Sequence, residues 1–384
     1  MNYRYIIIGR SDGVVKQSGY LEDYDLTSDY IDETKSNIVV KEDINFSVDD
    51  WVIIRSELEN GGVLSPKNVI YFGIVSGYEM ETHEVTIIEV RNTFNDEARI
   101  QNYTNLDTYN NWENALFQQV TGMSIHPSFK RIEYGQVQAN KYTQTTSPAF
   151  QRWDYSKDGT ELIVIKSIDF INSFFYRYGI GMYFDSVQQT LQPDGTMVNK
   201  VMMAFENRLT STSKYPVIKM KNNVDDVFMD FNFTDKNTST DSKNAIEIRS
   251  FQGTPVYYFR NEDGKITNNQ NDPKIHWPAS WYVAIRESYN DPVPSDASIA
   301  SDKLTLSKYN HVITFKTPID NRFLNGASGT IWDNINIGQR WDITDGNTTY
   351  QTVLTGVEVK SSDADNVYLT FGNSRNTIKN MLKL

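Results

Sequence analysis

Short runs of alternating hydrophobic and polar residues, separated by turn dipeptides, dominate the chain. Such runs cover residues 3–9, 14–20, 257–260, 265–268 and 309–316. Alternation with a period of two is typical of β-strands that bury one face. Asp12-Gly13 and Asp263-Gly264 each lie between two of these runs, where an Asp-Gly pair predicts a hairpin turn. The pattern therefore predicts a mainly β protein.

The middle of the chain has a different pattern. Hydrophobic residues over 106–122 and 162–178 approximate the helical period, and a glycine closes each segment, so both are expected to be helices. Further strands are expected over 179–185, 201–205 and 227–233, and a short basic helix over 373–384. The sequence thus predicts α+β inserts within a β framework.

Two segments near the ends of the chain resemble each other. Residues 51–88, the first repeat, and residues 341–372, the second repeat, both begin with a Trp-led strand. Both continue with aromatic-x-x-h-h-x-Gly-h-Glu, where h is hydrophobic, from Tyr71 to Glu79 and from Tyr350 to Glu358. A unit that recurs near both ends predicts two related small β-barrels in one chain.

At 384 residues the chain is too long for one ordinary core, and several domains are expected. We expect an N-terminal β-barrel over 1–105 and an α+β insert domain over 106–215. A β-rich domain with long loops is expected over 216–305, and a C-terminal β-barrel with a short terminal helix over 306–384. The predicted fold class is mainly β, with two related barrels plus inserted α+β domains.

Charge and composition exclude several function classes. The formal net charge of −12 disfavours nucleic acid and anionic membranes as specific partners. The chain has no cysteine, so it has no disulfide, zinc-thiolate site or cysteine nucleophile. No run approaches the length of a membrane span, and the first residues do not resemble a signal peptide. We therefore expect synthesis in the cytoplasm without a secretory signal.

No catalytic motif is complete. The segment from His83 to Ile87 begins like the zinc motif H-E-x-x-H, but Ile87 occupies the place of the second ligand. Gly179-Ile180-Gly181 lacks the third glycine of a dinucleotide fingerprint, because Phe184 stands there. Chance pairs of carboxylates are expected among 49 acidic residues. The sequence therefore predicts no enzyme activity, no metal and no cofactor.

A local aromatic cluster, Trp277, Trp281 and Tyr282, is the one candidate binding site. Aromatic faces stack on sugars, which suggests a platform for cell-wall saccharide. Aromatic side chains also dominate protein cores and subunit interfaces. Both interpretations stay open from the sequence.

The second repeat belongs to a longer signature of the form h-x-h-G-x-x-W-x-I-x-D-G-x-x-x-Y. Its positions are Ile335, Ile337, Gly338, Trp341, Ile343, Asp345, Gly346 and Tyr350. Residues 353–358 and 369–375 follow it, the latter reading L-T-F-G-x-x-R. This organisation resembles the structural module of siphophage tail-tip hub proteins in the tail-associated lysin family. The chain ends soon after Gly372, so it resembles a short form without the lysin domain.

The resemblance implies a fold shared with the baseplate hubs of contractile-tailed phages. Such a hub is a homotrimer in the virion that closes the distal end of the tail tube. Two barrels in each of three chains present six units, which match a sixfold distal tail ring. Further implied partners are receptor-binding proteins, the tail tube and the tape measure, and phage DNA passes through on ejection. A saccharide-binding phage adhesin and a cell-wall hydrolase are the alternatives.

Overall fold

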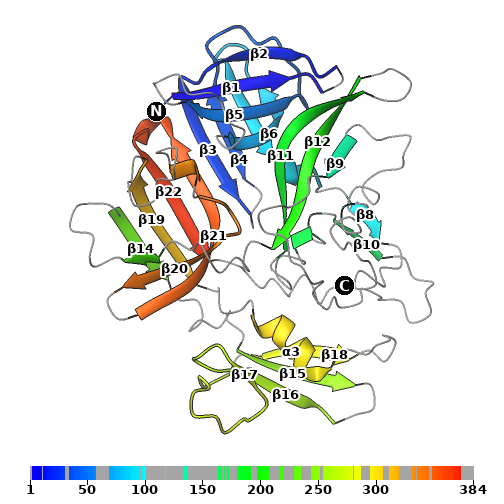
Figure 1. Cartoon of the computed structure of the whole chain (residues 1–384), viewed down its shortest axis with the longest axis vertical. Coiled ribbons are helices and arrows are strands. Elements are labelled where there is room, and N and C mark those ends of the chain that lie inside the picture. The colour runs from blue at the N-terminus through cyan, green and yellow to red at the C-terminus, as the bar shows by residue number, and fades with distance from the viewer. Residues whose placement is uncertain are drawn as a thin grey trace.

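A computed structural model gives the architecture (Figure 1). It describes residues 2–10, 12–30, 34–57, 69–94, 97–100, 117, 133–136, 163–166, 168, 171–172, 180–191, 197–207, 217–219, 229–234, 244–250, 254–279, 281–286, 295–305, 311–319, 331–333, 335–345 and 348–372. Everything below concerns these residues.

One large sheet contains strands from both ends of the chain. Its N-terminal strands are β1 (Asn2–Ile8), β2 (Val15–Tyr20), β3 (Asp23–Asp29), β4 (Lys35–Val39), β5 (Trp51–Glu57), β6 (Val69–Tyr78) and β7 (Glu84–Glu89). Its other strands are β13 (Val217–Lys219), β14 (Met229–Thr234), β19 (Val312–Pro318), β20 (Arg340–Asp345), β21 (Thr348–Lys360) and β22 (Asn366–Gly372).

The order of the hydrogen-bonded strands shows how the two ends of the chain are joined. The main path runs β14-β19-β22-β21-β3-β4-β7-β6-β5-β1-β2, and β20 pairs with both β13 and β21. The antiparallel pairing of β21 with β3 is the single link between the C-terminal and the N-terminal strands on this path. Both repeats therefore belong to one sheet, and Figure 1 shows β21 between β22 and β3.

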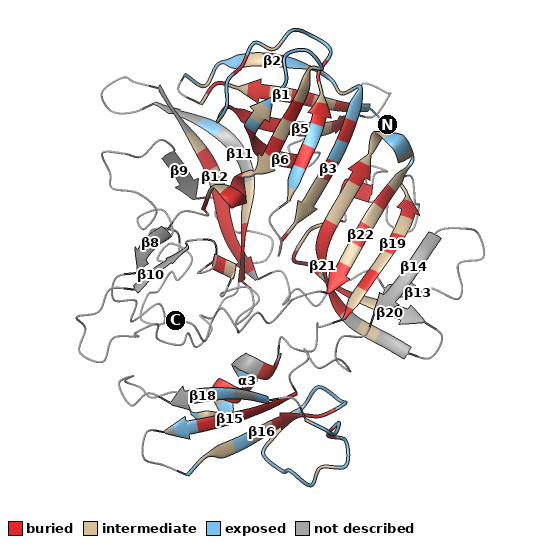
Figure 2. Cartoon of the chain, turned by 180° about the vertical axis from the view of Figure 1, so that it is seen from behind, coloured by how far each residue is buried: buried red, intermediate tan, exposed pale blue. Residues whose placement is uncertain are grey.

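A single hydrophobic core underlies both parts of this sheet. Tyr3, Tyr5 and Ile54 of the N-terminal strands belong to the same buried cluster as Trp341 and Phe371. Buried residues alternate with exposed or partly exposed ones along the strands, as the period of two requires; Figure 2 shows this along β22 and β19. Because the repeats bury their apolar faces together, they stabilise each other.

A second sheet contacts the outer face of the first repeat. Its strands run β11-β12-β9, with β11 (Ile180–Leu191), β12 (Met197–Asn207) and β9 (Glu133–Gln136). Val201 of β12 is buried with Trp51, Ile74 and Val90, and Val90 begins the short 3-10 helix η2 (Val90–Phe94). The insert is thus anchored on the first repeat. Two further strands, β8 (Glu97–Ile100) and β10 (Ile163–Lys166), pair with each other.

A small sheet lies at one end of the molecule (Figure 1). Its order is β17-β16-β15-β18, with β15 (Ala245–Ser250), β16 (Val256–Arg260), β17 (Ile266–Thr267) and β18 (Trp281–Arg286). Helix α3 (Asp296–Thr305) covers one face, where Ile246 and Ile248 pack on Ile299, Ala300 and Leu304. The remaining 3-10 turns are η8 (Ile331–Asp333) and η9 (Ser361–Asp363).

Most of the expected strands are present, and the mainly β class is confirmed. Gly13 and Gly264 adopt the left-handed backbone, with φ of 66° and 75°, that their hairpin turns require. The helix expected over 162–178 is wrong at its start, because residues 163–166 form β10 and pair with β8. Three β-branched or long apolar residues in a row favour the strand there. Ile168, Ile171 and Asn172 are helical.

Two other expected helices are not tested. Of the helix over 106–122 only Phe117 is described, and it is helical. The terminal helix over 373–384 lies outside the described residues. Within the described part of the chain, no helix has the length and apolarity to cross a membrane.

Candidate functional site at the junction of the two repeats

The two repeats contain the same irregularity at the same place. In the first repeat Val75 pairs with Ile87 and Gly77 with Thr86, which leaves Ser76 as an extra residue. In the second repeat the pairing passes from Leu354 to Gly356 and leaves Thr355 as the extra residue. Both extra residues precede the glycine of the shared motif. Such β-bulges are specific features that bend and twist a strand, so the likeness of the repeats is structural.

The side chains of the two bulge residues also have the same partner. The Ser76 hydroxyl donates to the carbonyl oxygen of Thr86 at 3.2 Å. The Thr355 hydroxyl lies 3.3 Å from the equivalent carbonyl of Thr370 and donates to that of Gly372 at 2.9 Å. The residue before the motif glycine, Ser76 or Thr355, is therefore a hydroxyl residue that hydrogen-bonds across the bulge to the partner strand.

A left-handed residue precedes the first strand of each repeat. Asp49 has a φ of 75° and its backbone N–H donates to Val75 at 2.8 Å. Gly338 has a φ of 83° and donates in the same way to Leu354 at 2.7 Å. Asp49 and Gly338 are therefore equivalent, as are Val75 and Leu354.

This equivalence corrects the alignment of the two tryptophans by one residue. Counted from Asp49 and Gly338, Trp341 is equivalent to Val52 and not to Trp51. Val52 and Trp341 both lie in the core that the repeats share. Trp51 belongs to the other cluster, with Val201 of the insert. A shift of one residue in a strand moves a side chain to the other face of the sheet. The two tryptophans therefore pack in different clusters.

The junction of the repeats lies directly after the second bulge. Residues 356–360 of β21 pair with residues 25–29 of β3 in reverse order. The backbone N–H of Tyr30 donates to the carbonyl of Thr355 at 2.8 Å. A Cβ atom added to Gly356 would lie 3.2 Å from the Cβ of Thr370 and 3.4 Å from Oδ2 of Asp29. The glycine thus permits the close approach of both β22 and β3.

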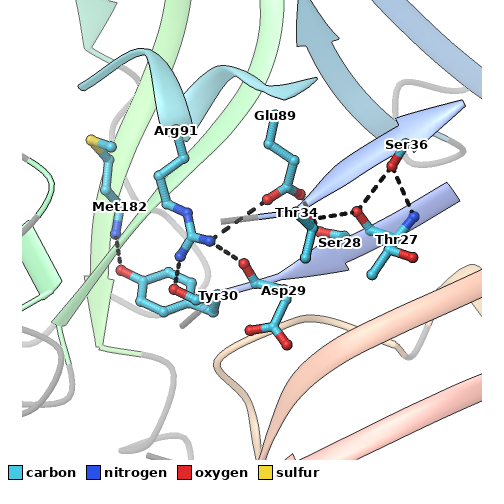
Figure 3. A network of polar contacts seen from close by, with 9 residues as sticks. All are labelled: Thr27, Ser28, Asp29, Tyr30, Thr34, Ser36, Glu89, Arg91 and Met182. Atoms are coloured by element: carbon cyan, nitrogen blue, oxygen red, sulfur yellow. Dashed lines mark hydrogen bonds and ion pairs between the residues drawn. The ribbon is translucent and has the colours of Figure 1, made fainter. Parts of the chain in front are cut away.

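A buried arginine fixes the end of β3 at this junction (Figure 3). The Arg91 guanidinium donates to the backbone carbonyls of both Asp29 and Tyr30. It also lies over the Tyr30 ring, with its central carbon 4.3 Å from the ring centroid. The Tyr30 hydroxyl accepts from the backbone N–H of Met182 at 3.0 Å. One cluster therefore connects β3, β21 and the insert strand β11.

Glu89 completes the polar cluster. Its carboxylate accepts a hydrogen bond from the Ser28 hydroxyl and lies 3.7 Å from Nη2 of Arg91. Burial raises the pKa of Glu89, while the Arg91 charge and the Ser28 hydrogen bond oppose the shift. The charge of the arginine is thus shared between one carboxylate and two backbone carbonyls.

The raised pKa of Glu89 gives a testable pH dependence. A carboxyl whose pKa is higher in the folded than in the unfolded state stabilises the fold fully below its unfolded pKa, about 4.3. This contribution is lost as the pH rises through the folded pKa. We expect the free energy of unfolding of Glu89→Gln, relative to the parent protein, to increase between pH 5 and pH 7. Urea denaturation at each pH measures it, and a difference that stays constant would contradict the prediction.

A second prediction concerns the bulge hydroxyls. Thr355→Val keeps the shape of the side chain but leaves the buried carbonyls of Thr370 and Gly372 with fewer donors, so we expect it to cost about 1–2 kcal/mol. Ser76→Ala is the matched variant, and its exposed hydroxyl should cost under about 0.5 kcal/mol. Urea denaturation compares the two, and equal losses would contradict the assigned roles.

No pattern in the sequence predicted this cluster. Arg91 directly follows a strand of the first repeat, and a buried charged residue carries no periodic signal of its own. The strand β3 was missed as well, because only Tyr24 and Leu26 are apolar among its acidic and hydroxyl residues. The shared glycine, Gly356, was found as part of the repeat, but its role appears only where β3 approaches it.

The aromatic candidates lie on the small sheet. Trp277 and Trp281 are 53% and 38% exposed, and their rings lie 5.6 Å and 5.3 Å from the ring of Phe259. Tyr257 contacts Trp281 edge to face. Tyr282 pairs in register with Ile246 of the α3-facing row, so the backbone does not place it in the same row as Trp281. The structure brings together the two tryptophans of the predicted three residues.

No family model matches the sequence, and no curated protein matches it. Solved structures do. The 43 kDa tail protein of prophage MuSo2 from Shewanella oneidensis has a TM-score of 0.51 and 9% identity, over 98% of this chain and 100% of that chain. A tail protein from Neisseria meningitidis MC58 has a TM-score of 0.49 and 11% identity, over 97% of this chain and 96% of that chain. A chain of the phage P2 baseplate in its activated conformation with Ca has a TM-score of 0.48 and 11% identity, over 98% of this chain and 100% of that chain.

The first of these likenesses shows a shared fold over nearly the whole chain. It says nothing of single residues, because 91 of every hundred aligned positions differ. Among the described residues there is no group of three or more His, Asp or Glu that could hold a metal ion.

Proposed function

We propose that this protein is a structural component of a phage tail, a trimeric hub that closes the distal end of the tail tube. In this role it attaches to the distal tail ring and opens for DNA ejection after host binding. The proposal includes no enzyme activity. The domain division 1–105, 106–215, 216–305 and 306–384 belongs to the same proposal.

The observation that carries the proposal is the duplicated unit. Two units with the same bulge, the same glycine and an entry residue in the same left-handed conformation lie in one sheet. Three such chains present six similar units, which suits a partner with sixfold symmetry. The fold shared with a prophage tail protein supports the same assignment. So does the resemblance of residues 335–375 to tail-tip hubs.

Mass measurement and a binding assay test the hub. We expect the purified full chain to form trimers in sedimentation equilibrium and to bind a distal tail ring protein from the same phage. A chain that stays monomeric at high concentration and does not bind that ring would overturn the proposal. A ring protein from an unrelated phage is the control.

The exposed tryptophan pair favours a second candidate function, the binding of cell-wall saccharide. Trp277 and Trp281 present aromatic surface beside Phe259 and Tyr257. We expect Trp281→Ala to abolish oligosaccharide binding on a glycan array if this function is correct. Val283→Ala, an exposed change on the same strand, is the control. An array without signal for the parent protein would overturn the saccharide role.

A further inference from the structure

The first repeat has an open strand edge where the second repeat is paired. In the second repeat, the edge of β21 after the bulge pairs with β3. The equivalent edge runs from Ser76 of β6 to Glu79, the residue directly after this strand. Among the described strands only β7 pairs with β6 here, along the opposite edge. The first repeat therefore lacks, within the described chain, the partner that the second repeat has.

The glycines shared by the two repeats, Gly77 and Gly356, also differ in what surrounds them. At Gly356 an added Cβ atom would meet Thr370 of β22 at 3.2 Å and Asp29 of β3 at 3.4 Å. At the equivalent Gly77 an added Cβ atom would meet nothing within 4 Å. Gly77 has no positive φ that would require glycine. Neither of the two contacts at Gly356 has a counterpart at Gly77 in the single chain, and the one from β3 is the contact that a further strand would supply.

At the other end of the sheet, β14 is an edge strand. It pairs with β19 and ends the strand order among the described residues. Beside the first repeat, β4 pairs with β7 as β19 pairs with β22 of the second repeat, and β3 lies beyond β4. Strand β14 is therefore the counterpart of β3, the strand that pairs with β21 at the junction.

We propose that β14 of one chain pairs with the Ser76–Glu79 edge of β6 in a second copy, as β3 pairs with β21 within the chain. This inference rests on the proposed trimer and names its contact surface. Because the two edges differ, the contact is head to tail. A repeated head-to-tail contact forms a ring when its rotation closes, and the proposed trimer is such a ring. The intrachain junction and the interchain contact would then alternate around six units.

The register of the contact follows from three successive pairings. In the first repeat Gly77 pairs with Thr86, Thr86 with Asn37, and Asn37 with Asp25. Each step crosses to the next antiparallel strand. Asp25 of β3 is thus three strands from Gly77.

The second repeat repeats these steps. Gly356 pairs with Thr370, Thr370 with Thr314, and Thr314 with Asn232. Asn232 of β14 is therefore the equivalent of Asp25. Two residues further along both strands, Thr234 is the equivalent of Thr27.

Thr27 pairs with Glu358, whose equivalent in the motif is Glu79. The proposal therefore places Thr234 of one chain opposite Glu79 of the next. Directly opposed residues of antiparallel strands have Cα atoms about 4.5–5.5 Å apart. That separation allows a disulfide bond.

Engineered disulfides test the register, and the parent chain has no cysteine to interfere. We expect the double variant Glu79→Cys/Thr234→Cys, oxidised in solution, to give a ladder that ends at the trimer on a non-reducing gel. Thr27→Cys/Glu358→Cys is the matched control and should close within one chain. Val15→Cys/Thr234→Cys probes β2, the competing free edge, and should give no ladder.

The outcomes separate the edge pairing from the hub itself. A trimer by mass in which residues 79 and 234 do not cross-link, or in which 15 and 234 do, would overturn the pairing and leave the hub standing. A strict monomer would overturn both. Gly77→Val supplies a test without cysteine, because we expect it to raise the concentration for trimer formation about tenfold or more. The urea midpoint of Gly77→Val should stay unchanged, and unchanged assembly would count against the pairing.

Discussion

Arg91→Ala will lower the free energy of unfolding by about 3–5 kcal/mol. The guanidinium is buried and donates to the carbonyls of Asp29 and Tyr30 at the end of β3. Removal leaves these carbonyls without their charged donor and leaves the carboxylate of Glu89 without a nearby cation. Urea denaturation of the full chain measures the loss.

The matched control for Arg91 is an exposed cation. Lys41 forms an ion pair with Glu22, and the two side chains are 71% and 56% exposed. Lys41→Ala should therefore cost under about 1 kcal/mol. If Arg91→Ala cost no more than Lys41→Ala, the cluster at the junction would not stabilise the fold as we describe.

Trp341→Ala will also cost about 3–5 kcal/mol. Trp341 is fully buried in the core that the two repeats share, and its ring contacts Phe371 edge to face at 5.4 Å. A large cavity there would lie under both repeats. Since a domain is stable by only about 5–15 kcal/mol, we expect the loss to be visible as a lower melting temperature.

Trp277→Ala is the control for Trp341→Ala. It removes the same number of atoms from a side chain that is half exposed on the small sheet. We expect a cost well below half of that of Trp341→Ala when the free energy of unfolding of both variants is measured by urea titration. Equal costs would mean that Trp341 does not lie in a shared core.

The repeat is the part of the structure that the sequence predicted best. The motif from Tyr71 to Glu79 and from Tyr350 to Glu358 identified the glycine and the residue before it, which are the equivalent bulge positions. The motif carries this information because both bulges lie at the same distance along the chain from its aromatic residue, and spacing is visible in the sequence. The two tryptophans did not mark equivalent positions, because a tryptophan can be buried on either face of the sheet.

The pairing of β3 with β21 at the junction could not be predicted from the sequence, for a physical reason. Strand β3 alternates only two apolar residues with acidic ones, so its strand pattern is weak. The pairing of β3 with β21 joins residues more than three hundred positions apart, and no local preference specifies such a contact. Arg91 is recognisable only once the carbonyls of Asp29 and Tyr30 lie beside it.

In the insert, the sequence predicted a helix where the structure has a strand. The dense apolar residues over 162–178 favoured a helix, but residues 163–166 pair with β8 as a strand. A short apolar run fits a buried strand and a buried helix equally well by period alone. Its β-branched residues were the signal that favoured the strand.

The central claim is that each chain supplies two equivalent units to a ring of three chains. Class averages of the purified full chain by electron microscopy test it most directly, since they show symmetry without labels or variants. We expect a threefold particle, three times 44.2 kDa, with a nearly sixfold face. Single chains, or a ring with a different number of copies, would contradict it.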